Sequence, residues 1–525
     1  MTYRKKLIEV ALPLEEINKQ SSREKSIRHG HPSTLHLWWA RRPLAACRAV
    51  LFSSLVDDPG EYLPEKEAEV ERQRLHRLIE QLVNWDNINN ETLLAQARLE
   101  IAHSVARNLN VEVPIGDAAI REFLVEKAPP VHDPFAGGGS IPLEAQRLGL
   151  RAFASDLNPV AVLINKALIE IPPKFANRPP VHPVEKSGQA SFAREWRGAA
   201  GLAEDVRYYG KWMRDEAEKR IGHLYPKIKL PSPPGRGAGG EGAGAEGQEA
   251  TVIAWLWART VKCPNPACGA TMPLVRSFWL SKKKGKYVWL EPVVDSKAKS
   301  VEFSIMKSEA TTSNSTFIDV GSGFLNDKGK KVKATFRCLI CKDGLAKGEY
   351  INSEAEQGRM KVMPLAIIAD SAAGRGYLPF DESHVRSAVD ETERYLSESS
   401  IRSRIPTEPA RGTFAGNAQG RIYGFKTFAD YFTLRQLVAL TTFSDLVSEA
   451  REHVRRDAVA AGLANDSVLL NDDGTGAQAY TDAVATYLAM GVSRLSDICN
   501  ALCRWESSKT QVRNLFARQA IPMVW

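Results

Sequence analysis

Residues 132–140 read HDPFAGGGS, a stretch whose residue types suit the binding of a nucleotide-like ligand. The three consecutive glycines, Gly137–Gly139, let backbone N–H groups approach a ligand with no side chain in the way. A dinucleotide-binding loop would need a third spaced glycine where Pro142 stands, and a P-loop would need a lysine directly after its glycines. The remaining interpretation is a strand that ends at Asp133, a glycine turn, and a helix over about 141–148.

A second carboxylate follows the next predicted strand. The sequence RAFAS, residues 151–155, is typical of a strand, and Asp156 comes directly after it. Ligands bind at the carboxyl ends of parallel strands, and an ionised carboxylate accepts hydrogen bonds from both hydroxyls of a ribose. The alternative is a tight strand-to-helix turn without a ligand. The position of Asp133 before the glycines and of Asp156 after them favours a nucleoside site.

Four cysteines form two pairs that suit a metal ion. Cys263 and Cys268 stand in CPNPACG, and Cys338 and Cys341 stand in CLIC. Each pair can place two thiolates on one turn, and two pairs fill all four positions of a tetrahedral site, which predicts a structural Zn²⁺. Because the first pair has four intervening residues and a long segment separates the pairs, four unrelated buried cysteines remain the alternative.

The other three cysteines, Cys47, Cys499 and Cys503, lie in helical patterns and are predicted to be core residues. The lysine-rich stretch SKKKGKYVWL between the cysteine pairs can contact phosphates and bases, or it can be a solvated hairpin tip. Both interpretations stay open.

Composition sets the class of protein. The 525 residues are 43% hydrophobic and 25% charged, as in soluble globular proteins, and the length predicts three or four domains. The net charge of +8 favours an acidic partner such as nucleic acid, and we expect this charge to be spread over the long chain. With no signal-peptide pattern and no apolar run of about 18 residues, we expect a cytoplasmic protein.

The elements that must position these residues divide the chain into five predicted segments. Residues 1–125 are mostly helical, and 126–230 follow a βαβ order. Residues 231–250 are a Pro/Gly-rich tract that we expect to be a disordered linker. Residues 251–360 hold the cysteine pairs and two aromatic-rich strands, TVIAWLWARTVKC and KYVWLEPVV. Residues 361–525 are mostly helical.

Three stretches together resemble one group of amino-methylating DNA methyltransferases. DPFAGGGS followed by SDLNPVAV resembles their S-adenosylmethionine site, and HPSTLHLWWARRPLAACRA at 31–49 resembles the N-terminal region of adenine-specific members that carry a zinc ribbon. The resemblance runs from near Tyr3 to Trp525. It implies an α/β fold: a partial Rossmann-like class I methyltransferase sheet, a helical N-terminal region, an inserted zinc ribbon, and a helical C-terminal region related to target recognition.

The resemblance also implies roles for named residues. The cofactor would be lined by Asp133, Phe135, Ala136, Gly137, Gly138, Gly139, Asp156, Leu157 and Asn158, with Asp156 at the ribose and Asn158 near the adenine. A segment ahead of the glycine loop closes over the methionine end in related enzymes, and Ser33, Thr34 and His36 are the candidates here. Helix capping is the alternative role for Ser33 and Thr34. Trp38 and Trp39 are predicted to be core residues.

One motif that this chemistry requires is missing. Methylation of a base amine uses Asp, Asn or Ser followed by Pro-Pro and an aromatic residue, which stacks on the flipped base. The chain's Pro-Pro pairs, in APPV, IPPK, RPPV and SPPG, all lack the aromatic residue. We therefore expect the chain to be the N-terminal portion of a longer enzyme or one half of a split one, inactive alone and completed by the missing part or a companion polypeptide.

The leading hypothesis is a DNA methyltransferase that binds double-stranded DNA and methylates an exocyclic amino group. By resemblance the target is adenine, and the setting is restriction–modification or phage defence. Two alternatives remain: a non-catalytic zinc-ribbon protein that binds nucleic acid, and a methyltransferase that acts on RNA or protein.

Overall fold

The computed structural model describes residues 4–27, 29–38, 40–183, 195–230, 248–310, 315–372, 374–410 and 420–515. The chain forms two compact units. Unit 1 comprises Met1–Gly210 and Ser448–Gly491, and unit 2 comprises Lys211–Val447 and Val492–Trp525. The division passes through three long helices, which are α10 (Ala200–Ile221), α14 (Leu434–Ala460) and α15 (Ala477–Ser496).

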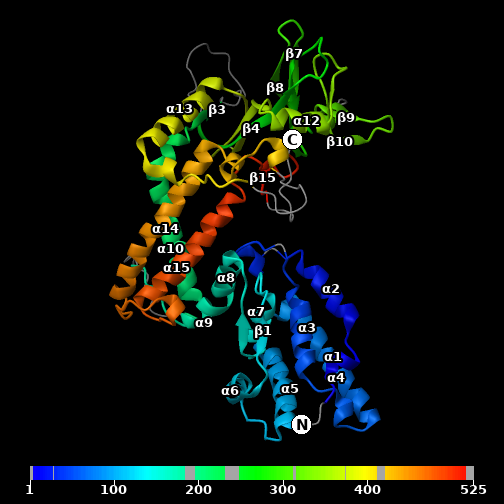
Figure 1. Cartoon of the computed structure of the whole chain (residues 1–525), viewed down its shortest axis with the longest axis vertical. Helices are drawn as coiled ribbons and strands as arrows, with labels where there is room; N and C mark the ends of the chain where they lie inside the picture. The colour runs from blue at the N-terminus through cyan, green and yellow to red at the C-terminus, as the bar shows by residue number, and fades with distance from the viewer. Residues whose placement is uncertain are drawn as a thin grey trace, which may run out of the picture. The chain divides into compact units, whose positions relative to one another are not determined.

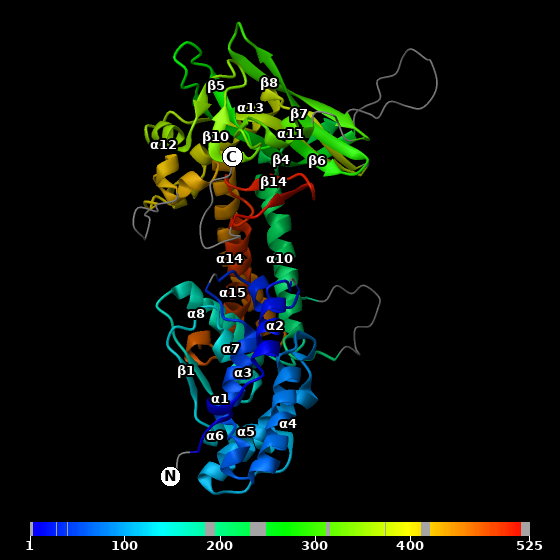
Figure 2. The same cartoon turned by 90° about the vertical axis from the view of Figure 1, so that its right-hand side faces the viewer.

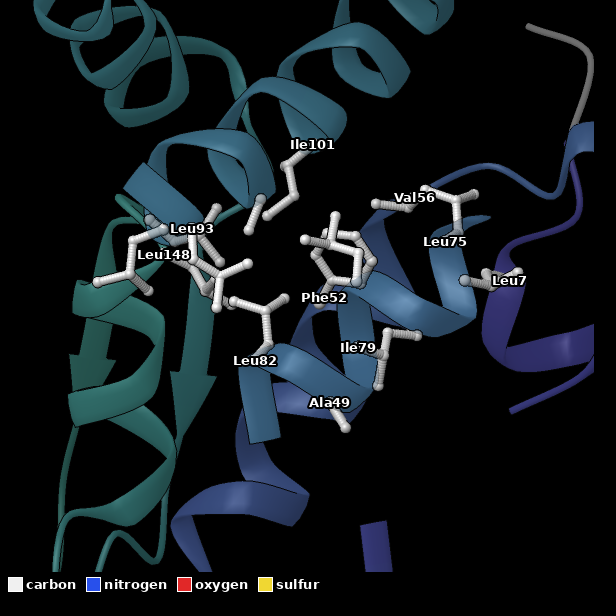
Figure 3. Packing of buried hydrophobic residues seen from close by; sticks show 14 of the residues in the cluster. Leu7, Ala49, Phe52, Val56, Leu75, Ile79, Leu82, Leu93, Ile101 and Leu148 are labelled. Atoms are coloured by element: carbon white, nitrogen blue, oxygen red, sulfur yellow. The ribbon is translucent and has the colours of Figure 1, made fainter. Parts of the chain in front are cut away.

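Unit 1 begins with helices, as the sequence predicted for residues 1–125. They are α1 (Leu7–Val10), α2 (Leu14–Glu24), α3 (Leu44–Leu55), α4 (Glu65–Val83), α5 (Glu91–Leu109) and α6 (Asp117–Lys127). Their buried apolar side chains form one core, in which Figure 3 shows Phe52 of α3, Ile79 of α4 and Ile101 of α5. Leu148 belongs to the same core, so residues on both sides of the boundary predicted at 125 pack together.

The strand–turn–helix–strand order around the glycines is confirmed. β1 (Val131–Asp133) is followed by α7 (Ser140–Arg147) and β2 (Ala152–Ala154), and Figure 1 shows β1 beside α7. β1 and β2 pair in parallel, with His132 opposite Phe153. Among the described residues of unit 1 this sheet has two strands, which fits an α/β class but is narrower than a Rossmann-like sheet. The elements that follow are α8 (Pro159–Asn165), a π-helical turn at Lys166–Glu170 and α9 (Ile171–Lys174).

Unit 2 is built on antiparallel sheets. A five-stranded sheet has the order β13-β12-β4-β3, with β5 also paired to β4, and β6, β7 and β8 form a three-stranded sheet (Figure 2). Two smaller sheets have the orders β11-β10-β9 and β14-β15. The strands are β3 (Ile228–Leu230), β4 (Gln248–Lys262), β5 (Thr271–Leu274), β6 (Trp279–Lys283), β7 (Lys286–Asp295), β8 (Ser300–Ser308), β9 (Gly323–Leu325), β10 (Lys331–Arg337), β11 (Leu345–Ala346), β12 (Lys361–Ser371), β13 (Gly374–Pro379), β14 (Arg504–Glu506) and β15 (Gln511–Arg513). Its shorter helices are α11 (Ser315–Val320), α12 (Gly348–Glu356) and α13 (Glu382–Glu398).

The sequence predicted β4 and β7 but not β12. β12 pairs with β4 in an antiparallel register that places Ile367 opposite Trp255. This pairing joins residues on the two sides of the boundary predicted at 360, and it places buried strand in a segment expected to be mostly helical.

Two other expectations concern the tract at 231–250 and membrane helices. Residues 231–247 lie outside the described residues, whereas 248–250 already belong to β4 rather than to a linker. Among the helices in the described part of the chain, none combines the length and the apolar character needed to cross a bilayer.

Candidate functional site

The turn after β1 brings the two predicted carboxylates to the same end of the parallel strand pair. Oδ2 of Asp156 accepts a hydrogen bond from the backbone N–H of Gly137 at 2.9 Å, and its Oδ1 accepts one from Asn158 N–H at 2.8 Å. Oδ1 of Asp133 accepts one from Phe135 N–H at 3.2 Å. The Asp156 carboxylate therefore lies directly against the glycine loop, so the two predicted parts of the site are adjacent.

The other predicted residues of the loop have distinct environments. Ala136 is buried and donates its N–H to the carbonyl of Ser155 at 3.0 Å. The side chain of Asn158 caps α8 by accepting the Val160 N–H at 2.9 Å. Phe135 and Leu157 are 78% and 95% exposed, so both apolar side chains stand free beside the carboxylates.

The glycines allow three side chains of the same chain to approach the loop closely. A Cβ added to Gly137 would lie 2.5 Å from Nε1 of Trp38, one on Gly138 would lie 2.9 Å from Nε of Arg41, and one on Gly139 would lie 2.8 Å from Oδ1 of Asn165. Gly137 and Gly139 also have φ angles of 51° and 75°, which disfavour any side chain. At these three glycines, side chains of the protein itself make the close approach that the sequence predicted for a ligand.

The predicted closing segment is arranged around His31. Oγ of Ser33 lies 2.8 Å from Nδ1 of His31, and the Thr34 hydroxyl donates to the His31 carbonyl at 2.7 Å. Nδ1 of His36 lies 3.0 Å from the carbonyl oxygen of Leu37. These hydroxyls are used within the short 3-10 turn Pro32–Thr34, whose N-cap is His31 and neither Ser33 nor Thr34.

Trp38 and Arg41 place the N-terminal segment against the glycine loop. Trp38 also packs against an apolar cluster that includes Ile164 and Met490, in agreement with its predicted core role. Trp39 lies outside the described residues. The motif LWWARRP supported the resemblance, but it did not predict that Arg41 lies against Gly138.

A buried acid–base network lies behind Arg41. Glu24 is 7% exposed and accepts hydrogen bonds from the Leu44 and Ala45 N–H groups at the start of α3, at 3.0 and 3.1 Å. Its Oε1 lies 2.8 Å from Nε2 of His31. Burial raises the pKa of Glu24, but the hydrogen bonds from His31 and the two N–H groups outweigh burial and hold it below its usual value. Burial lowers the pKa of Arg41, against the opposing charge of Glu24.

The structure brings the four predicted metal ligands together. All four sulfur atoms lie within 4.8 Å of one another, with Cys263 Sγ 3.7 Å from Cys341 Sγ and Cys268 Sγ 3.9 Å from Cys338 Sγ. Zinc–sulfur bonds of about 2.3 Å in a tetrahedron place the sulfurs about 3.8 Å apart. The cluster can therefore hold one metal ion of this kind.

Gly344 is part of this cluster, although no motif in the sequence indicated it. A Cβ at this position would lie 2.2 Å from Cys263 Sγ, so only glycine fits there without displacing the sulfur. Its N–H lies 3.4 Å from Cys341 Sγ. Burial raises the pKa of Cys341, but the N–H groups of Gly344 and Asp343 outweigh it and lower the pKa to about 7, which favours the thiolate.

The remaining cysteines lie apart from this cluster. Cys47 is buried in α3, as predicted, and burial raises the pKa of its thiol to about 12. Cys499 and Cys503 are half-buried in the turns after α15 rather than within a helix.

The positive charge is concentrated rather than spread. Residues 276–347 hold 15 Lys and Arg against 7 Asp and Glu, a net charge of +8 that equals the net charge of the whole chain. The stretch SKKKGKYVWL forms the hairpin of β6 and β7, and Lys283 and Lys284 are exposed at its tip. The Lys282 ammonium pairs with Asp319, which also accepts the Trp279 indole N–H at 3.0 Å. This region of unit 2 therefore carries the basic surface.

Comparison with known families identifies two segments of the chain. Residues 11–78 match the family model of a protein of unknown function (DUF1156), and this segment includes Trp38 and Arg41. A search of the curated proteins and a search of the solved structures found no match. Residues 118–195, which hold the glycine loop, Asp133 and Asp156, match the model of the D12 class N6 adenine-specific DNA methyltransferase, and this match supports DNA methylation as the general class of chemistry.

Proposed function

We propose that this chain is the cofactor-binding part of an S-adenosylmethionine-dependent DNA methyltransferase that acts on an exocyclic amino group, with adenine as the target base. The observation that carries the proposal is the hydrogen bond between Asp156 and the Gly137 N–H, within the segment that matches the D12 class. A carboxylate at the carboxyl end of the second strand and a glycine turn after the first are the two parts of a nucleoside site.

The free acceptor capacity of Asp156 fits a ribose. A carboxylate has about four lone-pair positions, and the Gly137 and Asn158 N–H groups use two of them. Each oxygen therefore retains a position for one ribose hydroxyl. The exposed side chains of Phe135 and Leu157 supply apolar surface for the adenine ring.

When bound, S-adenosylmethionine supplies an electrophilic methyl group on its sulfonium sulfur. Asp156 and the glycine loop would hold its nucleoside, and transfer of the methyl group to the target nitrogen would leave a neutral thioether and release a proton from the amine. The role of the described residues is to orient the methyl group for in-line attack, a source of rate that depends on close positioning.

The groups that hold the target amine are part of the proposal but not of the 525 residues, which contain no Pro-Pro-aromatic motif. We propose that a companion polypeptide, or another part of the same protein, supplies them. Exposed apolar side chains beside the two-stranded sheet support this, since Phe153 of β2 and Leu163 of α8 are 53% and 44% exposed. Further strands packed there would bury both.

We also propose that the cysteine cluster holds a structural Zn²⁺ and that the basic region 276–347 contacts the phosphates of double-stranded DNA. All four zinc positions would be filled by sulfur, which leaves none for a reacting water. A restriction–modification or phage-defence setting is proposed from the resemblance of the motifs alone.

Calorimetry of the full chain with S-adenosylmethionine tests the cofactor site. We expect binding heat in the unmodified chain and a loss of affinity of about 10-fold or more in Asp156→Ala, because a charge-assisted hydrogen bond contributes about 1.5–3 kcal/mol. Glu122→Gln, an exposed acid on α6, is the control and should bind normally. Absence of heat together with salt-dependent DNA binding would favour the non-catalytic nucleic-acid-binding alternative.

A further inference from the structure

The N-terminal segment and the glycine loop are in direct contact, although each matches a separate family. Arg41 approaches Gly138, Trp38 approaches Gly137, and the Ser140 hydroxyl at the start of α7 donates to the Arg42 carbonyl at 2.8 Å. A segment from a family of unknown function thus covers the turn at which the cofactor is proposed to bind.

Two contacts position the Arg41 guanidinium, but they leave part of its hydrogen-bonding capacity unused. Its Nη1 lies 3.5 Å from Nδ1 of His31 and its Nη2 donates to the His36 carbonyl at 3.3 Å, so both contacts are long. Its Nε is buried and has no hydrogen-bond partner among the described residues. A guanidinium donates through five N–H groups, and Nη1 and Nη2 make only these two long contacts, so they retain donor capacity for an acceptor from outside the chain.

The nearest acidic group does not fill that role. The Glu24 carboxylate already accepts from Leu44 N–H, Ala45 N–H and His31, and no ion pair joins it to Arg41 in the described part of the chain. Arg41 therefore lacks a direct anionic partner, while its planar fork suits a carboxylate.

The order of groups along the loop indicates which anion fits. Asp156, at Gly137, has acceptor positions that suit hydroxyl groups, and Arg41, at Gly138, has donors that suit an anion. A ligand that fits both carries a ribose and, a short distance away, a carboxylate. The amino terminus of α7 begins at Ser140 beside Arg41 and adds a positive dipole end at the same place.

We propose that Arg41 binds the carboxylate of the cofactor's methionine group, so that the N-terminal segment of unknown function forms one wall of the cofactor site. This inference rests on the proposed function and gives Arg41 the place that the sequence assigned to Ser33, Thr34 and His36. Glu24 and His31 are then positioning residues, which hold the guanidinium over Gly138.

Two ligands that differ in the carboxylate test the assignment. S-adenosylhomocysteine carries the amino-acid group, whereas 5′-methylthioadenosine keeps the nucleoside and the thioether but lacks that group. We expect Arg41→Gln to weaken S-adenosylhomocysteine by about 10-fold or more and to leave 5′-methylthioadenosine unchanged. Arg41→Lys should lie between the two, because it keeps the charge and loses the fork.

The neighbouring Arg42→Gln is the matched control, since Arg42 is exposed and should affect neither ligand. Ligand-free thermal unfolding of each variant shows whether it folds. Equal weakening of both ligands by Arg41→Gln, or no weakening, overturns the role of Arg41 while the cofactor site stands. If the unmodified chain binds neither ligand, the proposed function fails and this inference fails with it.

Discussion

The cysteine cluster of unit 2 and the glycine loop of unit 1 were both predicted from short motifs, yet they differ in how much of a site those motifs specify. In the cluster, four side chains converge at the spacing of a sulfur tetrahedron, and one unforeseen residue, Gly344, makes room for them. At the glycine loop, Trp38, Arg41 and Asn165 occupy the closest approaches. A metal ion is bound by a few strong ligands, whereas a nucleoside is bound by a surface that several distant segments must build.

The largest effect that we expect is the loss of metal from Cys338→Ser. One ligand of a complete set is removed, and structural zinc contributes on the order of 10 kcal/mol to small zinc domains. Metal analysis should fall from about one zinc per chain to almost none, and the unfolding transition of unit 2 should move to lower temperature. Cys503→Ser, whose thiol lies 3.1 Å from the Ile498 carbonyl, should retain the metal. Full zinc content in Cys338→Ser would refute the four-ligand assignment.

Adding the same methyl group to one glycine of each site sharpens the comparison. Neither Gly344 nor Gly138 has a positive φ, so the neighbours decide the outcome. In Gly344→Ala the methyl meets a sulfur that a bound metal would hold fixed, and we expect zinc affinity to fall about 10- to 100-fold. In Gly138→Ala it meets the Arg41 side chain, whose two hydrogen-bond contacts are long enough to let it shift, and we expect less than about 1 kcal/mol of lost stability. Metal-chelator competition measures the zinc affinity of Gly344→Ala, and chemical denaturation measures the stability of Gly138→Ala. Effects of equal size in the two variants would contradict this difference between the sites.

The basic region offers a third contrast, between two lysine pairs. Lys283→Gln with Lys284→Gln should weaken DNA binding and reduce the slope of log affinity against log salt by about 1–2, near the 0.9 expected per phosphate contact. Lys66→Gln with Lys127→Gln removes the same charge from unit 1 and should leave the slope unchanged. Fluorescence anisotropy over a salt series measures both, and a matching loss in the unit 1 pair would mean that net charge alone drives binding.

The last prediction concerns the buried network of Glu24 and His31 beside Arg41. Because the pKa of Glu24 lies below its ordinary 4.5 in the folded chain, its stabilisation is present above pH 4.5 and is lost as the pH falls through the folded value. Glu24→Gln should lower the free energy of unfolding by about 1–2 kcal/mol at pH 7 and by less in acid. Denaturation at several pH values measures this, and a pH-independent difference would show that the charge of Glu24 does not matter.

The parts of the structure that could be predicted from the sequence are local. The order β1, α7, β2 follows from apolar strands around a glycine turn, and the four ligands follow from cysteine pairs. The missed features join residues far apart in the chain. The run LAIIA in β12 has the length of a buried strand, but its partner β4 lies about a hundred residues earlier. Arg41 meets Gly138, and Gly344 meets Cys263, over similar separations. No local pattern marks such contacts.

The pairing of β4 with β12 has a consequence for how this protein can change. Thr260, near the end of one strand, faces Lys361, the first residue of the other, so the two ends of the intervening segment lie at adjacent positions, and β5 within that segment also pairs with β4. Residues 263–360, which include the four cysteines of the cluster and the lysine-rich hairpin, are thus inserted between two neighbouring positions of this strand pairing. The length or sequence of the part that follows β5 can therefore change while the pairing of β4 with β12 is kept, which offers chimeric design a place to alter the proposed contacts with DNA.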